Sequence, residues 1–252
     1  MNIHRILSLG LIFTVIFAVA CASIDNAQRK KEAEAKRDLG EAYIRDRKFT
    51  LALKELLEAE ELNPNDYYLQ NDLGLVYYHK NLHDKAIVHF KKSLDIKPDF
   101  GLAMNNLGNA YAAQKEWDLA IEYYAKAADA PLYATPHYPL TNLGDIYYEK
   151  KDYKRSEDYY LQALKLKPDF PLALRGLART YMALNRSEEA IVKLQKAIKI
   201  APDYALLHYD LAKAYQLSGD VSKARQAYQT VIELAPDSPL ADEAQLAIEH
   251  LK

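Results

Sequence analysis

Few residues of this 252-residue chain belong to the types that carry out covalent or metal chemistry. Cys21 is the single cysteine, so it has no partner for a disulfide within the chain. His79 and His83 stand four residues apart, the spacing of two metal ligands on one continuous helix. We expect a turn to fall between them, however, and His83 occupies a position that aromatic residues fill elsewhere in the sequence. We therefore interpret His83 as a packing residue and expect neither a metal ion nor a cofactor.

The acidic pairs of the chain are the other candidates for catalysis. Glu60–Glu61 and Glu188–Glu189 fall in helical patterns without a serine or histidine placed to act with them, so we interpret them as solvated helix faces. The sequence has only 8 glycines and lacks the glycine-rich loops that cradle phosphates. Its formal net charge of −2 argues against a face that binds nucleic acid. We expect no enzyme, no small-molecule substrate and no nucleic-acid partner.

The residues around Cys21 suggest another role for it. Arg5 is followed by an uncharged run over residues 6–19, which is too short to span a bilayer comfortably but suits the apolar core of a secretory signal. Ala18 and Ala20 then precede the cysteine at positions −3 and −1. This arrangement resembles the lipobox of bacterial lipoproteins, with Ala18 in the place of the usual leucine. The alternative is an ordinary or uncleaved signal peptide in which Cys21 has no role.

The lipobox resemblance implies a membrane anchor. In that family the cysteine is acylated and becomes the new N-terminus, and each buried methylene contributes about 0.8 kcal/mol to membrane attachment. Ala22 follows the cysteine, where an aspartate would mark inner-membrane retention in enteric bacteria, so the outer membrane is favoured. We predict a signal peptide over residues 1–20, then the lipidated cysteine and a short tether over residues 21–32.

A period of 34 residues runs through the remainder of the chain, with one step of 36. A small residue opens each period, a tyrosine follows three residues later, and a proline closes five of the six units. This pattern resembles the tetratricopeptide repeat (TPR), a pair of antiparallel helices. The small residues are Gly40, Gly74, Gly108, Gly144, Ala178 and Ala212, and the tyrosines are Tyr43, Tyr77, Tyr111, Tyr147, Tyr181 and Tyr215.

Each mark of the repeat has a mechanical reason. Small residues let the two helices of a unit approach closely, and a proline cannot continue the helix that it follows. Because no helix pair buries its own apolar stripe, neighbouring pairs must stack. We predict an all-α, right-handed superhelical solenoid of six TPR helix-turn-helix repeats over residues 33–238, with a capping helix over residues 239–252. We expect the repeats to begin at residues 33, 67, 101, 137, 171 and 205, and Asp66, Asp99, Asp169, Asp203 and Asp237 to cap the helices that follow them.

One junction departs from the period. Residues 129–145, DAPLYATPHYPLTNLGD, contain two extra residues and three prolines. The segment is either a longer surface loop or the mark of a particular family.

The surface most suited to recognition is the inner face formed by the first helix of each repeat. In TPR proteins ligands lie along this concave groove, and aromatic and arginine side chains are common anchors of protein interfaces. We carry the groove positions over by register, and we expect them to bind a protein client. They are Tyr68, Asn71, Leu75, Tyr78, Asn105, Asn109, Tyr138, Asp145, Tyr148, Arg175 and Arg179.

The lipobox, the six repeats, the chain length and the junction over residues 129–145 together resemble the type IV pilus biogenesis lipoproteins called pilotins, which are PilF/PilW-like and Tgl-like. The resemblance implies that the client is a secretin subunit. The chain would bind that subunit at the periplasmic face of the bacterial outer membrane, localise it and promote its assembly. The alternative is a lipoprotein adaptor that docks peptidoglycan hydrolases or other envelope enzymes.

Overall fold

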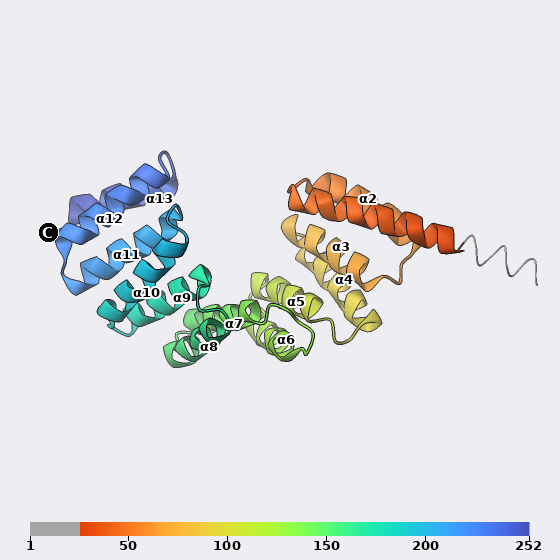
Figure 1. The fold of residues 1–252 in the computed structure, drawn as a ribbon, viewed down its shortest axis with the longest axis horizontal. Coiled ribbons are helices and arrows are strands. Elements are labelled where there is room, and N and C mark those ends of the chain that lie inside the picture. Colours follow the sequence, from red (N-terminus) through yellow and green to blue (C-terminus); the bar gives the residue numbers. More distant parts are fainter. Residues whose placement is uncertain (1–25, 252) are drawn as a thin grey trace, which may run out of the picture. The chain divides into compact units, whose positions relative to one another are not determined.

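The computed structural model describes residues 26–251, and all regular secondary structure in that range is helical (Figure 1). The predicted signal peptide, the lipobox with Cys21 and the first part of the tether lie outside these residues. Within the range, none of the helices combines the length and the apolarity needed to cross a membrane.

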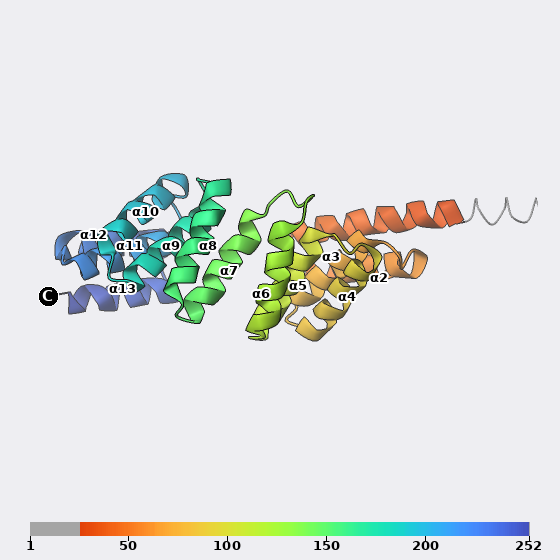
Figure 2. The same cartoon turned by 90° about the horizontal axis from the view of Figure 1, so that it is seen from below.

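The chain divides into two compact units, Met1–Gln114 and Lys115–Lys252. The division falls inside the predicted third repeat, which the sequence pattern does not anticipate. In the first unit a helix over residues 26–45 precedes four others, and consecutive helices run in opposite directions (Figures 1 and 2). The four are α2 (Phe49–Leu62), α3 (Tyr67–His79), α4 (His83–Ile96) and α5 (Gly101–Ala113).

The second unit contains eight helices, each packed on the next along the chain. The odd-numbered helices α3, α5, α7, α9 and α11 of the two units begin at the predicted repeat starts, and α13 begins where the capping helix was expected. The eight are α6 (Trp117–Asp129), α7 (His137–Glu149), α8 (Tyr153–Leu166), α9 (Pro171–Ala183), α10 (Ser187–Ile200), α11 (Ala205–Ser218), α12 (Val221–Leu234) and α13 (Pro239–His250).

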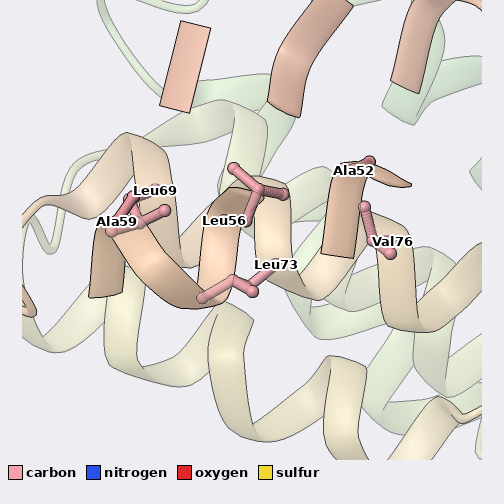
Figure 3. Packing of buried hydrophobic residues seen from close by; sticks show 6 residues of the cluster. All are labelled: Ala52, Leu56, Ala59, Leu69, Leu73 and Val76. Carbon is pink, nitrogen blue, oxygen red and sulfur yellow. The ribbon is translucent and has the colours of Figure 1, made fainter. Parts of the chain in front are cut away.

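A core of the first unit lies between α2 and α3 (Figure 3). Each helix contributes side chains three or four residues apart, which a helix of 3.6 residues per turn places on one stripe. All six side chains are at most 1% exposed, and full burial of a leucine contributes roughly 1.5–3 kcal/mol. They are Ala52, Leu56 and Ala59 on α2 and Leu69, Leu73 and Val76 on α3.

The glycine of the second repeat marks a close contact between helices. A Cβ added to Gly74 on α3 would lie 2.5 Å from the ring of Phe90 on α4, and Phe90 is completely buried. The two helices pack against each other along this contact. The expectation that Gly74 removes bulk where two helices meet is therefore confirmed.

The turns inside the repeats share a left-handed residue. Arg47, Asn81, Lys115, Lys151 and Asn185 have φ between 58° and 63°. Each stands shortly after the first helix of its repeat, where a residue in this conformation commonly ends a helix. In the last repeat the same place is taken by a glycine with φ of 84°. The turn geometry thus recurs although the sequence rarely provides the glycine that favours it.

The predicted helix caps are correct only for α3. Asp66 accepts hydrogen bonds from the backbone N–H groups of Tyr68 and Leu69. The other four aspartates stand one residue earlier relative to the preceding proline, and the N-cap positions are occupied by the residues that follow them. Those N-cap residues are Phe100 for α5, Phe170 for α9, Tyr204 for α11 and Ser238 for α13.

The junction over residues 129–145 contains a surface loop followed by α7. Leu132 in the loop is 82% exposed. Pro139 lies in the first turn of α7, where the backbone N–H groups have no partner within the helix, so a proline is tolerated there. Residues 130–136 thus form the longer surface loop that was one of the two interpretations of this junction.

Candidate functional site

The first unit carries a hollow of about 540 Å³, within the range of roughly 300–1,000 Å³ that ligand pockets occupy. It is bounded by the helix over residues 26–45, by α3 and by α5, which are the first helices of three consecutive repeats. We call it the unit-1 hollow. Its lining residues are Arg37, Glu41, Ile44, Arg45, Tyr68, Asn71, Asp72, Leu75, Leu102 and Asn106.

Three residues that the sequence predicted for a groove, Tyr68, Asn71 and Leu75, line the unit-1 hollow. Tyr68 is 46% exposed, and Leu102 from α5 is exposed beside it. Tyrosine side chains are common anchors of protein interfaces, and aliphatic surface beside them is favourably buried by a bound partner. Tyr68, Leu75 and Leu102 therefore supply an apolar surface that a bound polypeptide can touch.

Asn71 has a different role from the one expected. Its side chain is buried, and the Nδ2 of Asn106 donates a 2.9 Å hydrogen bond to its Oδ1. Its own Nδ2 donates a longer bond, 3.3 Å, to Asp72. Both ends of the Asn71 amide are thus used inside the protein, where they join α3 to α5 and build the wall of the hollow.

Asp72 is the residue of this site that sequence reasoning missed. Its carboxylate lines the unit-1 hollow, where the surrounding protein removes much of its hydration. This desolvation raises the pKa of Asp72 to about 7, although the hydrogen bond from Asn71 and the charge of Arg37 act in the opposite direction. The sequence shows only a polar residue beside an apolar stripe, and its state depends on neighbours about 30 positions away.

The charged residues around Asp72 are paired with one another. Arg37 Nη1 lies 2.7 Å from Asp66 Oδ2, and Arg37 Nη2 lies 2.9 Å from Asp38 Oδ1. Arg45 pairs with Glu41 at 3.2 Å across one helical turn. Among residues 26–251, Asp72 itself makes no ion pair.

The second unit carries a smaller hollow of about 110 Å³, between α7 and α9, which we call the unit-2 hollow. Four of the predicted groove residues line it, namely Tyr138, Asp145, Arg175 and Arg179. The remaining lining residues are Thr141, Asn142, Phe170, Leu172 and Gly176.

The charged side chains that line the unit-2 hollow each have a partner within the protein. Arg175 Nε lies 2.5 Å from Asp210 Oδ2, and the Arg179 guanidinium stands 4.5 Å from the centre of the Tyr148 ring. The Tyr160 hydroxyl donates a 2.5 Å hydrogen bond to Asp145. The walls of the hollow raise the pKa of Asp145 by desolvation, against the effects of this hydrogen bond and of the two arginines.

The two hollows occupy equivalent places in the repeat, because α3 and α7 start 70 residues apart and so do α5 and α9. Tyr68 therefore corresponds to Tyr138 and Leu102 to Leu172. Asp72, in contrast, corresponds to the neutral Asn142. In the first unit the framework thus presents an acid without an ion pair. In the second unit Arg175 pairs with Asp210, and Asp145 accepts a hydrogen bond from Tyr160.

Four of the predicted groove residues line neither of these hollows. Tyr78 packs against His79 and His83, and Tyr148 stacks with Arg179 beside the unit-2 hollow. Asn105 is buried on α5, and Asn109 lies one turn further along the same helix.

Three histidines among the described residues of the first unit, His79, His83 and His89, are packing residues. His79 stacks on Phe49 with 4.6 Å between ring centres, and His83 packs beside Tyr78. His89 is buried and shares a 2.8 Å hydrogen bond with Gln70. Among the residues that the structure describes, no group of three His, Cys, Asp or Glu side chains could hold a metal ion.

Models of the tetratricopeptide repeat match residues 37–100, 99–169 and 205–238, and a further TPR model matches residues 178–219. The chain is a tetratricopeptide repeat protein. The predicted all-α fold of TPR helix-turn-helix repeats is confirmed. TPR proteins are in general non-catalytic modules that bind protein partners, so this chain is a protein-interaction scaffold.

Solved structures of TPR proteins are similar to this chain. PilW, a widely conserved type IV pilus biogenesis factor, aligns with a TM-score of 0.77 and 23% identity over 84% of this chain and 98% of PilW. PilF from Pseudomonas aeruginosa aligns with a TM-score of 0.75 and 19% identity over 87% of this chain and 99% of PilF. These TM-scores establish a shared fold.

A third TPR structure aligns less closely. YrrB, a TPR protein with an unusual peptide-binding site, gives a TM-score of 0.56 at 19% identity, over 76% of this chain and 97% of YrrB. No curated protein sequence matches the chain significantly.

Proposed function

We propose that this TPR protein is a pilotin of the type IV pilus system. In this proposal a lipid on Cys21 anchors the chain at the periplasmic face of the bacterial outer membrane. The repeats bind a secretin subunit, hold it at the membrane and promote assembly of the secretin pore. The chain carries out no catalytic step.

The observation that carries this proposal is the extent of the likeness to two type IV pilus biogenesis factors. The alignments include nearly all of PilW and PilF, with TM-scores of 0.77 and 0.75. YrrB shares the repeat, yet it aligns with a TM-score of only 0.56. A chain of the APC/C hetero-tetramer Cut9-Hcn1 reaches a comparable TM-score of 0.76, but the alignment covers only 45% of that chain. The support for the proposal is therefore the combination of a high TM-score with coverage of nearly the whole of PilW and PilF.

The N-terminal sequence supports the membrane anchor. Residues 1–21 combine a short basic start, an uncharged run and small residues before Cys21. Anchoring two partners in one membrane raises their effective concentration without any new contact between them. Lipidation would thus let a modest affinity for the client suffice.

The two hollows support a role in holding a polypeptide. The unit-1 hollow exposes Tyr68 and Leu102 to solvent, beside the partly buried Leu75, around a cavity of about 540 Å³. The unit-2 hollow adds Tyr138 and Leu172, which are 41% and 45% exposed. Aromatic and aliphatic side chains of this kind bind client side chains by burying apolar surface.

The proposal is tested in the bacterium that encodes the chain. Deletion of the gene is expected to remove secretin multimers from the outer-membrane fraction, as judged by immunoblotting of unheated samples. The wild-type chain restores them. The Cys21→Ala variant is expected to fold, because the described repeats do not include that residue, but to leave the membrane fraction and fail to restore the multimers.

Two results would contradict the proposal. Secretin multimers that persist at wild-type levels in the outer membrane after deletion would exclude a role in secretin assembly. Co-purification of a peptidoglycan hydrolase, with no secretin, from native membranes would favour the adaptor alternative.

A further inference from the structure

The unit-1 hollow has an apolar wall and an acidic group without a cationic partner. Ile44, Leu75 and Leu102 provide aliphatic surface, and Tyr68 adds an aromatic ring. Asp72 shares the lining with these residues and is half-buried. A carboxylate in such surroundings has lost part of its hydration without gaining a cation in return.

The balance of charge around the hollow is acidic. Four acids, Asp38, Glu41, Asp66 and Asp72, stand against two bases, Arg37 and Arg45. Both bases are already held by carboxylates. Arg37 is held by Asp66 and Asp38, and Arg45 by Glu41. The acid in excess inside the cavity is Asp72.

We propose that the unit-1 hollow receives one lysine or arginine side chain of the bound polypeptide, whose cationic end pairs with Asp72 while its aliphatic stem lies along Leu75 and Leu102. This inference rests on the proposed function, since it concerns how that client is recognised. Lysine and arginine side chains commonly bury their methylene groups against apolar surface while the charged end finds a polar partner. The hollow offers both environments within one cavity.

The cationic preference belongs to the first unit. Asn142 stands in the unit-2 hollow at the place equivalent to Asp72. The acid of that hollow, Asp145, accepts a hydrogen bond from Tyr160 and faces Arg175 and Arg179. A lysine there would meet two arginines, so the unit-2 hollow would not select it.

Recognition of a cation at Asp72 depends on pH. The pKa of the free Asp72 carboxyl is raised to about 7, and the ionised form is the one that pairs with a cation. Affinity is therefore greatest above pH 7 and falls as Asp72 gains a proton below it. The charged groups facing Asp72 are Arg37, Glu41 and Arg45 from the helix over residues 26–45 and Asp66 before α3, while α5 presents the neutral Leu102 and Asn106.

The test uses the full chain in detergent solution and a fluorescent peptide library. Each pool has one fixed central residue, lysine, arginine, norleucine or glutamate, and mixed residues elsewhere. Anisotropy titration at pH 8 is expected to show lysine and arginine pools binding at least about fivefold more tightly than the norleucine pool, which corresponds to an ion pair of about 1 kcal/mol. Between pH 8 and pH 6 the lysine pool is expected to lose about threefold in affinity, because a carboxyl of pKa about 7 becomes mostly protonated and the fivefold contribution of the ion pair is largely lost.

Matched variants locate the effect. Asp72→Asn keeps the shape of the side chain and is expected to abolish both the cation preference and its pH dependence. Asp158→Asn removes the same charge from an exposed place on α8 and is expected to retain both.

Three outcomes would overturn the inference. Equal binding of all four pools, or a cation preference that survives in Asp72→Asn, would show that Asp72 does not select the ligand, while peptide binding by the scaffold would stand. Absence of binding by every pool would remove this inference as well. In each case the proposed function is judged separately, by the secretin multimers in the membrane.

Discussion

Asn106 on α5 donates a buried 2.9 Å hydrogen bond from Nδ2 to Oδ1 of Asn71 on α3. The two asparagines stand 35 residues apart, on the first helices of consecutive repeats. Both also line the unit-1 hollow. The bond therefore connects two consecutive repeats and also fixes part of the wall of the candidate site.

Removal of this bond is expected to destabilise the first unit. Asn106→Ala leaves the buried Asn71 oxygen without its donor, at an expected loss of about 1–3 kcal/mol in the free energy of unfolding. Urea denaturation followed by circular dichroism measures the change. Because the residues act as a pair, Asn71→Ala with Asn106→Ala should lose less than the sum of the single variants. Strict additivity would show that the bond contributes nothing.

The contact between Gly74 and Phe90 predicts a steric effect. Gly74→Ala places a methyl group 2.5 Å from a buried ring, and overpacking of this kind costs typically 1–3 kcal/mol. The higher helix propensity of alanine offsets about 1 kcal/mol of this cost. The destabilisation that is left is expected to lower the melting temperature. Phe90→Leu in the Gly74→Ala background should reduce the penalty of the alanine. A melting temperature raised by Gly74→Ala alone would contradict the packing described.

The left-handed turns predict a stabilising substitution. Lys151 has φ of 60°, a conformation that costs roughly 1–2 kcal/mol for a residue with a side chain. Lys151→Gly is expected to relieve part of this strain and raise the melting temperature. Lys154→Gly in the first turn of α8 is the control, and it should lower stability by up to about 1 kcal/mol. Equal effects at the two positions would refute the turn argument.

The raised pKa of Asp72 predicts how stability changes with pH. Its folded pKa of about 7 exceeds the unfolded value of about 3.9, so the folded state binds more protons between these values. The contribution of Asp72 to stability is therefore favourable at low pH and is lost as pH rises towards 7.

The Asp72→Asn variant measures this contribution. It should gain stability relative to wild type as pH rises from 4 to 7, by an amount on the order of 1 kcal/mol because the side chain is partly hydrated. Urea midpoints measured at several pH values give the difference. The Asp158→Asn variant controls for the loss of one negative charge. A wild-type chain more stable than Asp72→Asn at pH 8 would be incompatible with a desolvated, unpaired carboxyl.

The repeat architecture could be predicted because it depends on local marks that recur. Gly74, with Tyr77 three residues later, sets the register of a helix pair, and the helices begin where that register places them. The helix caps depend on a finer register. Asp66 stands two residues after Pro64 and caps α3, whereas Asp99 stands one residue after Pro98 and is one residue too early to cap α5.

The candidate site could be predicted only in part. Repeat register identified Tyr68 and Leu75 as residues of the inner face, and both line the unit-1 hollow. It could not show that the amide oxygen of Asn71 accepts a hydrogen bond from Asn106. Nor could it show that Arg37 pairs with Asp66 and leaves Asp72 without an ion pair. Those properties arise from contacts between repeats, which a single helical pattern does not contain.

The central claim is that the unit-1 hollow holds a secretin polypeptide. It is tested most directly by a photo-crosslinking amino acid at position 68, in cells that assemble the pilus. Val88 on α4 is the matched control, because it is 52% exposed, comparable to 46% for Tyr68, and does not line the hollow. We predict a crosslinked adduct with secretin from position 68 and none from position 88. An adduct from position 88 alone, or no secretin adduct from position 68 in a chain that supports assembly, would contradict the account.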